Sequence, residues 1–137
     1  MTADYELAEH GADLALSVRG PDPEACLRAA LRGFAAHVAE VPSDRPQTPH
    51  PVELRGKPAA WLVDALDEAI ALLDIEGALA CGLVGVEIGR DGLRGFLVTV
   101  SIAGLSLRGA PPKAATWHTA RLEPTDEGWE GRVVLDL

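Results

Sequence analysis

The stretch VGVEIGRDGLRGFLVTVSI, residues 84–102, contains two runs of alternating residues with a tight-turn sequence between them. The first run alternates from Val84 to Ile88, the second alternates from Phe96 to Ile102, and Asp91-Gly92 lies between them. Alternation with a period of two is typical of a half-buried strand, and an Asp-Gly pair between two such runs favours a short turn. The stretch therefore predicts a β-hairpin, which makes the second half of the chain a β region.

Towards the C-terminus the alternation continues in two further stretches. One covers residues 114–122, and the other covers residues 129–137 after the turn sequence Thr125-Asp126-Glu127-Gly128. One side of the last stretch is apolar enough to be anchored in a sheet. We therefore expect this strand to run to Leu137 within the sheet, close to the strand that begins at Asp13.

Towards the N-terminus the spacing becomes helical. Residues 14–19 alternate and predict a strand. Asp22-Pro23 then has the pattern of a helix N-terminus, because an aspartate side chain caps free amides and proline fits the first turn. The helical spacing extends to Val38, and it places Cys26 and His37 on a face that is more typical of a core than of a zinc site.

A proline-rich stretch and a second helix complete the first half. Residues 41–51 contain four prolines, whose missing amides and fixed φ disfavour regular structure, so we predict a loop there. Residues 52–55 predict a short strand, and residues 58–74 have apolar side chains at helical spacing, opposed by Asp64, Asp67 and Glu68. The whole order predicts an α+β fold, in which two helices cover one face of a mixed or antiparallel sheet.

Length and composition restrict the class of protein. The chain has 137 residues, of which 47% are hydrophobic, so we expect a single domain over residues 1–137 that needs no disulfide or structural metal. Cys26 and Cys81 lie far apart and the acidic N-terminus is unlike a secretory leader, which favours the cytoplasm. No apolar run reaches the ~20 residues of a membrane span. The net charge of −9 argues against tight direct binding to nucleic acid, because such a surface repels phosphates.

Three features could take part in chemistry, although no phosphate loop, dinucleotide fingerprint or nucleophile elbow occurs. Asp13 lies at the entrance of a predicted strand, and Lys113, one of only two lysines, follows Pro111-Pro112 at the start of another. Asp136 and the carboxylate of Leu137 put two negative charges at the end of the last strand. If Asp13 lies near them, three sets of oxygen donors would fit a hard divalent cation.

Two of these features also have a simpler explanation. Aspartate is common at strand boundaries, so Asp13 can be an ordinary turn residue. A lysine on an edge strand discourages pairing between molecules, so Lys113 can be an ordinary surface residue. The residues by themselves leave both interpretations open.

Three motifs follow one another along the chain. They are Glu9-His10-x-Ala12-Asp13-Leu14, Lys113-Ala114-x-Thr116-Trp117-His118 and Gly128-Trp129-x-x-Arg132-Val133-Val134-Leu135-Asp136-Leu137. Together they resemble the archease family, which they match in order and spacing over essentially the whole chain. The two helical segments agree with that family as well.

The resemblance implies a function and a site. Archeases are accessory proteins of RtcB-type RNA ligases, which join RNA ends in tRNA splicing and RNA repair. The resemblance implies that this protein promotes the guanylylation and repeated turnover of such a ligase without catalysing the joining itself. The family's metal site, commonly assigned as calcium, falls on Asp13, Asp136 and Leu137, and its functional lysine falls on Lys113. His10 and His118, in the same motifs, are weaker candidates for the surface that faces the ligase.

The chain departs from the family pattern in the first motif and around this lysine. Gly11 stands where threonine is usual, and Pro112 stands where valine is usual. The segment before the lysine, residues 107–111, is shorter than usual and lacks the histidine and lysine that are typical there. These departures affect the expected ligase-facing surface more than the metal residues. Two other hypotheses remain: a metal-dependent hydrolase or nucleotide-handling enzyme centred on Asp13 and Lys113, and a chaperone-like interaction module.

Overall fold

A computed structural model describes all of residues 1–137 and contains two helices and nine strands. Each helix follows a pair of strands, and only strands follow the second helix. In chain order they are β1 (Asp4–His10), β2 (Asp13–Gly20), α1 (Pro23–Val38), β3 (Ala39–Glu40), β4 (Thr48–Arg55), α2 (Pro58–Glu76), β5 (Ala78–Gly89), β6 (Gly92–Ser101), β7 (Ser106–Leu107), β8 (Ala114–Pro124) and β9 (Trp129–Asp136).

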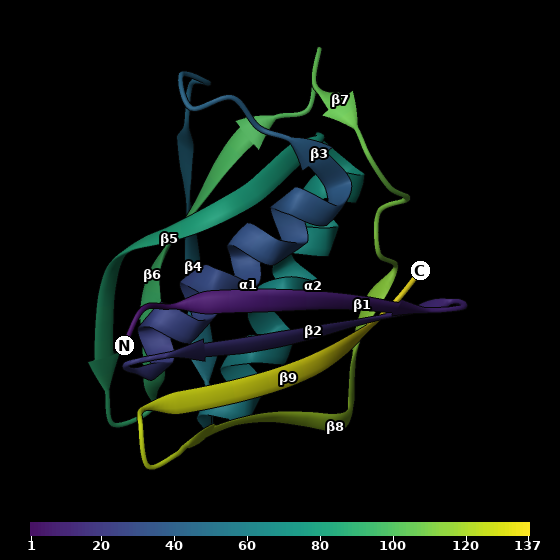
Figure 1. Ribbon diagram of the computed structural model, residues 1–137. Coiled ribbons are helices and arrows are strands. Elements are labelled where there is room, and N and C mark those ends of the chain that lie inside the picture. Colours follow the sequence, from purple (N-terminus) through teal and green to yellow (C-terminus); the bar gives the residue numbers. More distant parts are fainter.

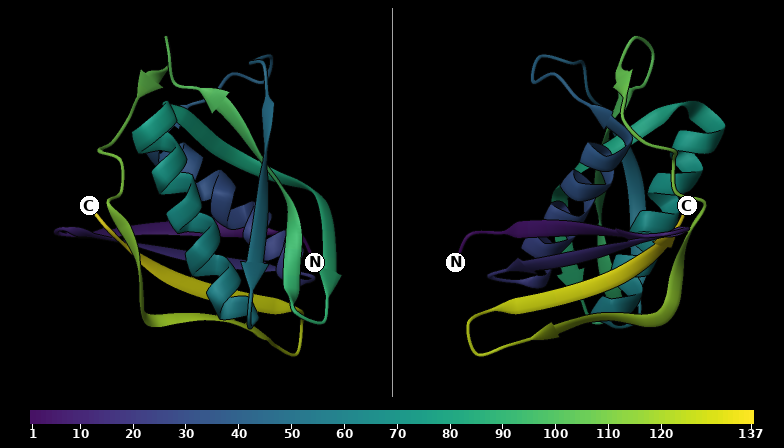
Figure 2. Two further views of the ribbon diagram at one scale, coloured as in Figure 1. Left: turned by 180° about the vertical axis from the view of Figure 1, so that it is seen from behind. Right: turned by 45° about the vertical axis from the view of Figure 1, so that its right-hand side comes forward.

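The strands form two main antiparallel sheets with the helices between them. One sheet has four strands in the order β1-β2-β9-β8, the other has three in the order β4-β6-β5, and β3 pairs only with β7. In Figure 1 the four-stranded sheet lies in front of the helices, and the view from behind in Figure 2 brings the three-stranded sheet forward. Both helices contact both sheets.

The predicted α+β class is confirmed, but the strands divide between two main sheets instead of forming one. The reason lies in the helices, which are apolar around most of their circumference. Nine residues of α1 and eight of α2 are buried, which is more than a single sheet face covers. The two layers enclose a core of 32 buried residues.

Local signals for the helix ends and the hairpin turn are confirmed. The Asp22 carboxylate accepts a hydrogen bond from the Ala25 N–H at 2.8 Å, which caps α1. Gly92 follows the turn between β5 and β6 with φ 145°, and a Cβ there would lie 2.1 Å from the Leu54 carbonyl oxygen. Only glycine fits this position, so the Asp91-Gly92 turn is fixed by sterics.

The predicted loop over residues 41–51 is wrong at its end, because β4 already begins at Thr48. Pro49 and Pro51 both lie within β4, opposite Val98 and Phe96 of β6. An edge strand tolerates proline where the missing N–H would face away from its neighbour, and β4 is at the edge of its sheet. The two prolines are two residues apart, so both face the same side.

The sequence pattern does not predict β1. Its residues DYELAEH alternate, but only Tyr5 and Leu7 are large apolar residues, and both are only half-buried. The strand pairs on one side only, with β2, from Asp4 opposite Arg19 to His10 opposite Asp13. Its place is therefore set by the strand beside it more than by its own hydrophobic pattern.

Candidate functional site

Asp13 and Asp136 face each other at one end of the four-stranded sheet. A turn at Gly11, which has φ 62°, reverses the chain after β1 and places Asp13 first in β2, directly opposite Asp136 near the end of β9. The Leu137 N–H donates to the Ala12 carbonyl at 2.8 Å. This bond flanks the aspartates and makes them a non-hydrogen-bonded pair, in which the Cα atoms are about 4.5 Å apart and the side chains are closest.

Both aspartates project from the sheet face that turns away from the helices. Their neighbours Leu14 and Leu135 are fully buried on the helix side, so the alternation of the strands puts Asp13 and Asp136 on the other side. None of the eight ion pairs in the structure involves either aspartate. Like charges directly opposite each other destabilise a sheet, so this pair favours a bound cation.

Lys113 lies immediately beside this pair. Its N–H donates to the Asp136 carbonyl at 2.7 Å, and the next residue, Ala114, is the register partner of Asp136 in β8. The Lys113 side chain is exposed and takes part in no ion pair. Figure 1 shows the C-terminus close to both the β1–β2 turn and the start of β8. The Lys113 ammonium is therefore free for a partner molecule.

The two histidine candidates have different positions. His10 is the register partner of Asp13, so His10, Asp13, Asp136 and Ala114 form one row across the four strands. His118 lies in an irregular part of β8, where residues 117–120 leave the ladder between Thr116 and Arg121. The sheet therefore brings His10 to the aspartates and leaves His118 outside their row.

The donors at this end of the sheet suit a hard cation. We call Asp13, Asp136 and the carboxylate of Leu137 the carboxylate corner. His10 shares their row, but no group of three histidine, cysteine, aspartate or glutamate side chains is placed to hold a metal ion, so a third ligand would have to be the Leu137 carboxylate. All of these donors are oxygens, which calcium prefers, and the Leu137 N–H bond to Ala12 holds the last residue in place. Carbonyl oxygens or water would have to complete the coordination of any such cation.

Sequence reasoning missed Asp67, which it placed on the polar side of the second helix. One carboxylate oxygen of Asp67 accepts a hydrogen bond from the Ala115 N–H at 2.9 Å, which joins α2 to the start of β8. Asp64 lies one turn earlier on the same helix. Burial, and then the charge of Asp67, raise the pKa of Asp64. The only sequence signal was this pair of acids three residues apart.

Sequence reasoning placed His37 on the core-facing side of the first helix, where the residue is half-buried and lies outside the core, and missed its polar contacts. The side chain is only 8% exposed, and its Nε2 lies 3.1 Å from the Ala110 carbonyl oxygen. Its Nδ1 lies 3.7 Å from the Glu9 carboxylate. His37 thus joins α1 to the segment before Lys113 and to the end of β1.

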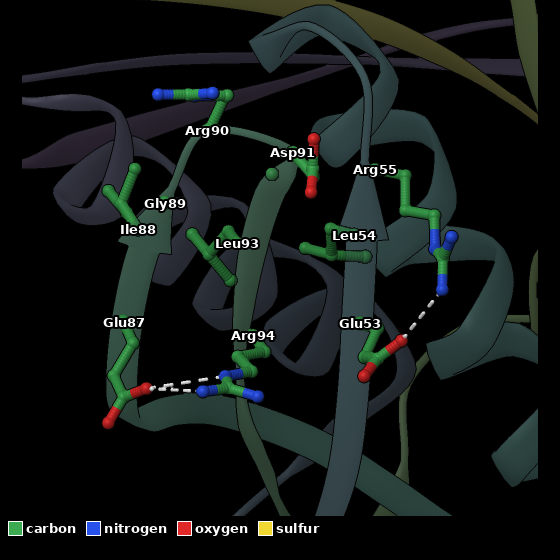
Figure 3. A pocket seen from close by; sticks show the side chains of 11 residues that line it. Glu53, Leu54, Arg55, Glu87, Ile88, Gly89, Arg90, Asp91, Leu93 and Arg94 are labelled. Carbon is green, nitrogen blue, oxygen red and sulfur yellow. Dashed lines mark hydrogen bonds and ion pairs between the residues drawn. The ribbon is translucent and has the colours of Figure 1, made fainter.

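A separate hollow lies at the other main sheet, near the β5–β6 turn. Figure 3 shows its charged side chains, with Arg94 bound to Glu87 at 3.1 Å and Arg55 to Glu53 at 3.3 Å. These side chains are exposed, and exposed ion pairs contribute little energy. Arg90 and Asp91 also line the hollow, and both are exposed and form no ion pair. No lining residue belongs to the three sequence motifs, so the hollow is the weaker candidate.

Comparisons with known proteins identify the fold. The sequence matches the model of the archease protein family (MTH1598/TM1083) over residues 5–137. The solution structure of Methanobacterium thermoautotrophicum protein 1598 is similar with a TM-score of 0.74 and 21% identity, over 97% of this chain and 98% of that one. The crystal structure of a Thermotoga maritima archease, described as a possible chaperone, is similar with a TM-score of 0.66 and 18% identity, over 96% of each chain. At these identities the two structures show the fold alone.

No curated protein matches the sequence. Neither helix combines the length and apolar character needed to cross a membrane.

Proposed function

Because the chain belongs to the archease family, we propose that it is an accessory protein that activates an RtcB-type RNA ligase of tRNA splicing and RNA repair. It promotes guanylylation of the ligase and its repeated turnover, and it does not join RNA itself. The observation that supports this proposal best is the Lys113 N–H bond to the Asp136 carbonyl. This bond fixes the free lysine beside the carboxylate corner, so two opposite charges reach the partner together.

In this proposal the two parts of the site act differently. Asp13, Asp136 and the Leu137 carboxylate hold a divalent cation, calcium by resemblance, whose charge offsets the repulsion between them. Lys113 presents its ammonium to an acidic or phosphate-bearing group of the ligase complex. An ammonium is a compact point charge, and a planar guanidinium does not replace it.

The other hypotheses receive less support from the contacts. A nucleophilic enzyme needs a nucleophile hydrogen-bonded to a base, and the structure gives neither Asp13 nor Lys113 such a side-chain partner. The Thermotoga maritima relative is described as a possible chaperone, which agrees with an accessory role for that protein. The proposal includes a cytoplasmic location, in agreement with two free cysteines. It includes contact with the ligase and no tight direct binding of RNA, in agreement with the net charge of −9.

The test measures guanylylation and multiple-turnover ligation by the cognate ligase with and without this protein. Lys113→Ala should keep the free energy of unfolding within about 0.5 kcal/mol, as exposed substitutions do, and should no longer stimulate the ligase. Lys113→Arg should also be impaired. Lys57→Ala is the matched control, because Lys57 is the other lysine of the chain and its exposed side chain makes no capping bond to α2.

Two outcomes would contradict the proposal. If the wild-type protein leaves guanylylation unchanged, the ligase is not its partner. If Lys113→Ala stimulates the ligase like wild type, at equal concentration and thermal stability, Lys113 is an ordinary surface lysine.

A further inference from the structure

The segment that leads to Lys113 is attached to both helices. We call residues 110–115 the lysine arm. Pro111 and Pro112 restrict its backbone, because proline fixes φ and has no N–H to donate. Besides the Lys113 bond to β9, one side chain from each helix holds the arm, His37 of α1 at Ala110 and Asp67 of α2 at Ala115.

The Asp67 contact holds the outer side of an edge strand. β8 is the last strand of its sheet, so amides that face away from β9 have no strand partner. The Ala115 N–H is one of these, and it donates to Asp67 at 2.9 Å across 48 residues of sequence. Ala115 itself is buried. Without its acceptor this amide would lack a hydrogen bond, which would raise the free energy of the folded state. The bond therefore fixes where β8 starts.

The His37 contact holds the other end of the arm. A carbonyl oxygen can only accept, so Nε2 of His37 carries the hydrogen and donates a hydrogen bond to the Ala110 carbonyl oxygen at 3.1 Å. The backbone packs directly against this ring, because a Cβ at Gly109 would lie 3.1 Å from the His37 Cε1 atom. The Arg108 N–H also donates to the Val38 carbonyl at 2.8 Å, which seats the same stretch on the end of α1.

We propose that Asp67 and His37 are positioning residues, which place the ammonium of Lys113 by fixing the backbone on both sides of it. The inference rests on the proposed function, because Lys113 has no partner within the chain and its partner would belong to the ligase complex. A lysine on a fixed backbone loses less conformational freedom when it binds, and a displacement of about 1 Å can cost a reaction up to about a hundredfold. Asp67 and His37 therefore act through Lys113 and need not touch the ligase.

Amide hydrogen exchange tests the positioning directly. Asp67→Ala removes the acceptor, whereas Asp67→Asn keeps an oxygen at that position and removes the charge. We expect the Lys113 amide, which Asp67 does not bind, to exchange about three- to tenfold faster in Asp67→Ala and at the wild-type rate in Asp67→Asn. Asp64→Asn is the matched control and should leave exchange unchanged. Wild-type exchange of Lys113 in Asp67→Ala would overturn the proposal.

A second pair of variants tests the other end of the arm. Glutamine can place a donor near the position of the imidazole Nε2, whereas asparagine is too short to reach it. His37→Gln should therefore keep the Lys113 amide protected, and His37→Asn should expose it. Equal exchange of this amide in the two variants, both still folded by circular dichroism, would contradict the role of the Ala110 bond.

Ligase stimulation then separates positioning from general stability. Asp67→Ala should lower the maximal rate of guanylylation about tenfold, and Asp67→Asn should restore it. Maximal rates as low in Asp67→Asn as in Asp67→Ala would overturn the inference. If wild-type protein does not stimulate the ligase, the proposed function fails, while the exchange experiment still decides whether the two residues fix the arm.

Discussion

Replacing Asp13 by asparagine should change thermal stability in opposite directions with and without calcium. Asp13 and Asp136 are opposite each other in a non-hydrogen-bonded pair, where Cβ atoms are about 5 Å apart. Two carboxylates at that distance, one exposed and one half-buried, repel each other by about 0.5–1 kcal/mol in a water-like dielectric. Without metal, Asp13→Asn should therefore raise the midpoint of unfolding by about 2–4 °C.

With calcium the order should reverse. A ligand that binds only the folded state at a hundred times its Kd adds about 2.7 kcal/mol, and this gain should be lost in the variant because a carboxylate ligand is missing. The assay is thermal unfolding followed by circular dichroism, in EDTA and in millimolar calcium. Asp44→Asn, an exposed aspartate of the loop before β4, is the control and should behave like wild type in both buffers. Equal gains from calcium in wild type and Asp13→Asn would refute the site, and a less stable Asp13→Asn in EDTA would refute the repulsion.

Three further outcomes follow from other contacts. A glycine appended after Leu137 turns its carboxylate into a neutral amide carbonyl, so calorimetry should show weaker calcium binding, while a glycine added before Met1 should not. Burial, and then the charges of Asp22 and Glu130, raise the pKa of the Cys26 thiol from 9.0 to about 11. The unfolded chain therefore releases this proton first, so urea titrations should show stability falling between pH 9 and 11, and less so in Cys26→Ala. Thr119 is β-branched and has φ 69° in the irregular part of β8, so Thr119→Gly should raise the free energy of unfolding by about 1 kcal/mol, and a lower value would show that the Thr119 backbone is unstrained.

Much of the fold was predictable because its signals are local. The Asp22 side chain caps an amide only three residues away, and the Asp91-Gly92 turn depends on one glycine. The position of the last strand followed from its one apolar face, and the pairing of Asp13 with Asp136 confirms it. The prolines of β4 misled the prediction, because whether a missing N–H matters depends on which side of the strand is paired.

The parts of the site that were missed depend on contacts across the fold. His37 binds a carbonyl 73 residues away, and Asp67 binds an amide 48 residues away. In both cases the partner is a backbone group, which every residue carries, so no residue type in the sequence marks it. A helical pattern gives the burial of His37 and the polar side of Asp67, but only the tertiary arrangement shows what each side chain binds.

The place of β9 has a consequence for how the protein is made. It is the last strand of the chain, yet it lies between β2 and β8. During translation β2 is complete at Gly20, but its neighbour begins only at Trp129, 109 residues later. At about 5–20 residues per second the ribosome needs roughly 5–20 s for that interval, in which one side of the first hairpin remains open. The four-stranded sheet, and with it the pairing of Asp13 and Asp136, can form only after synthesis has reached the last strand.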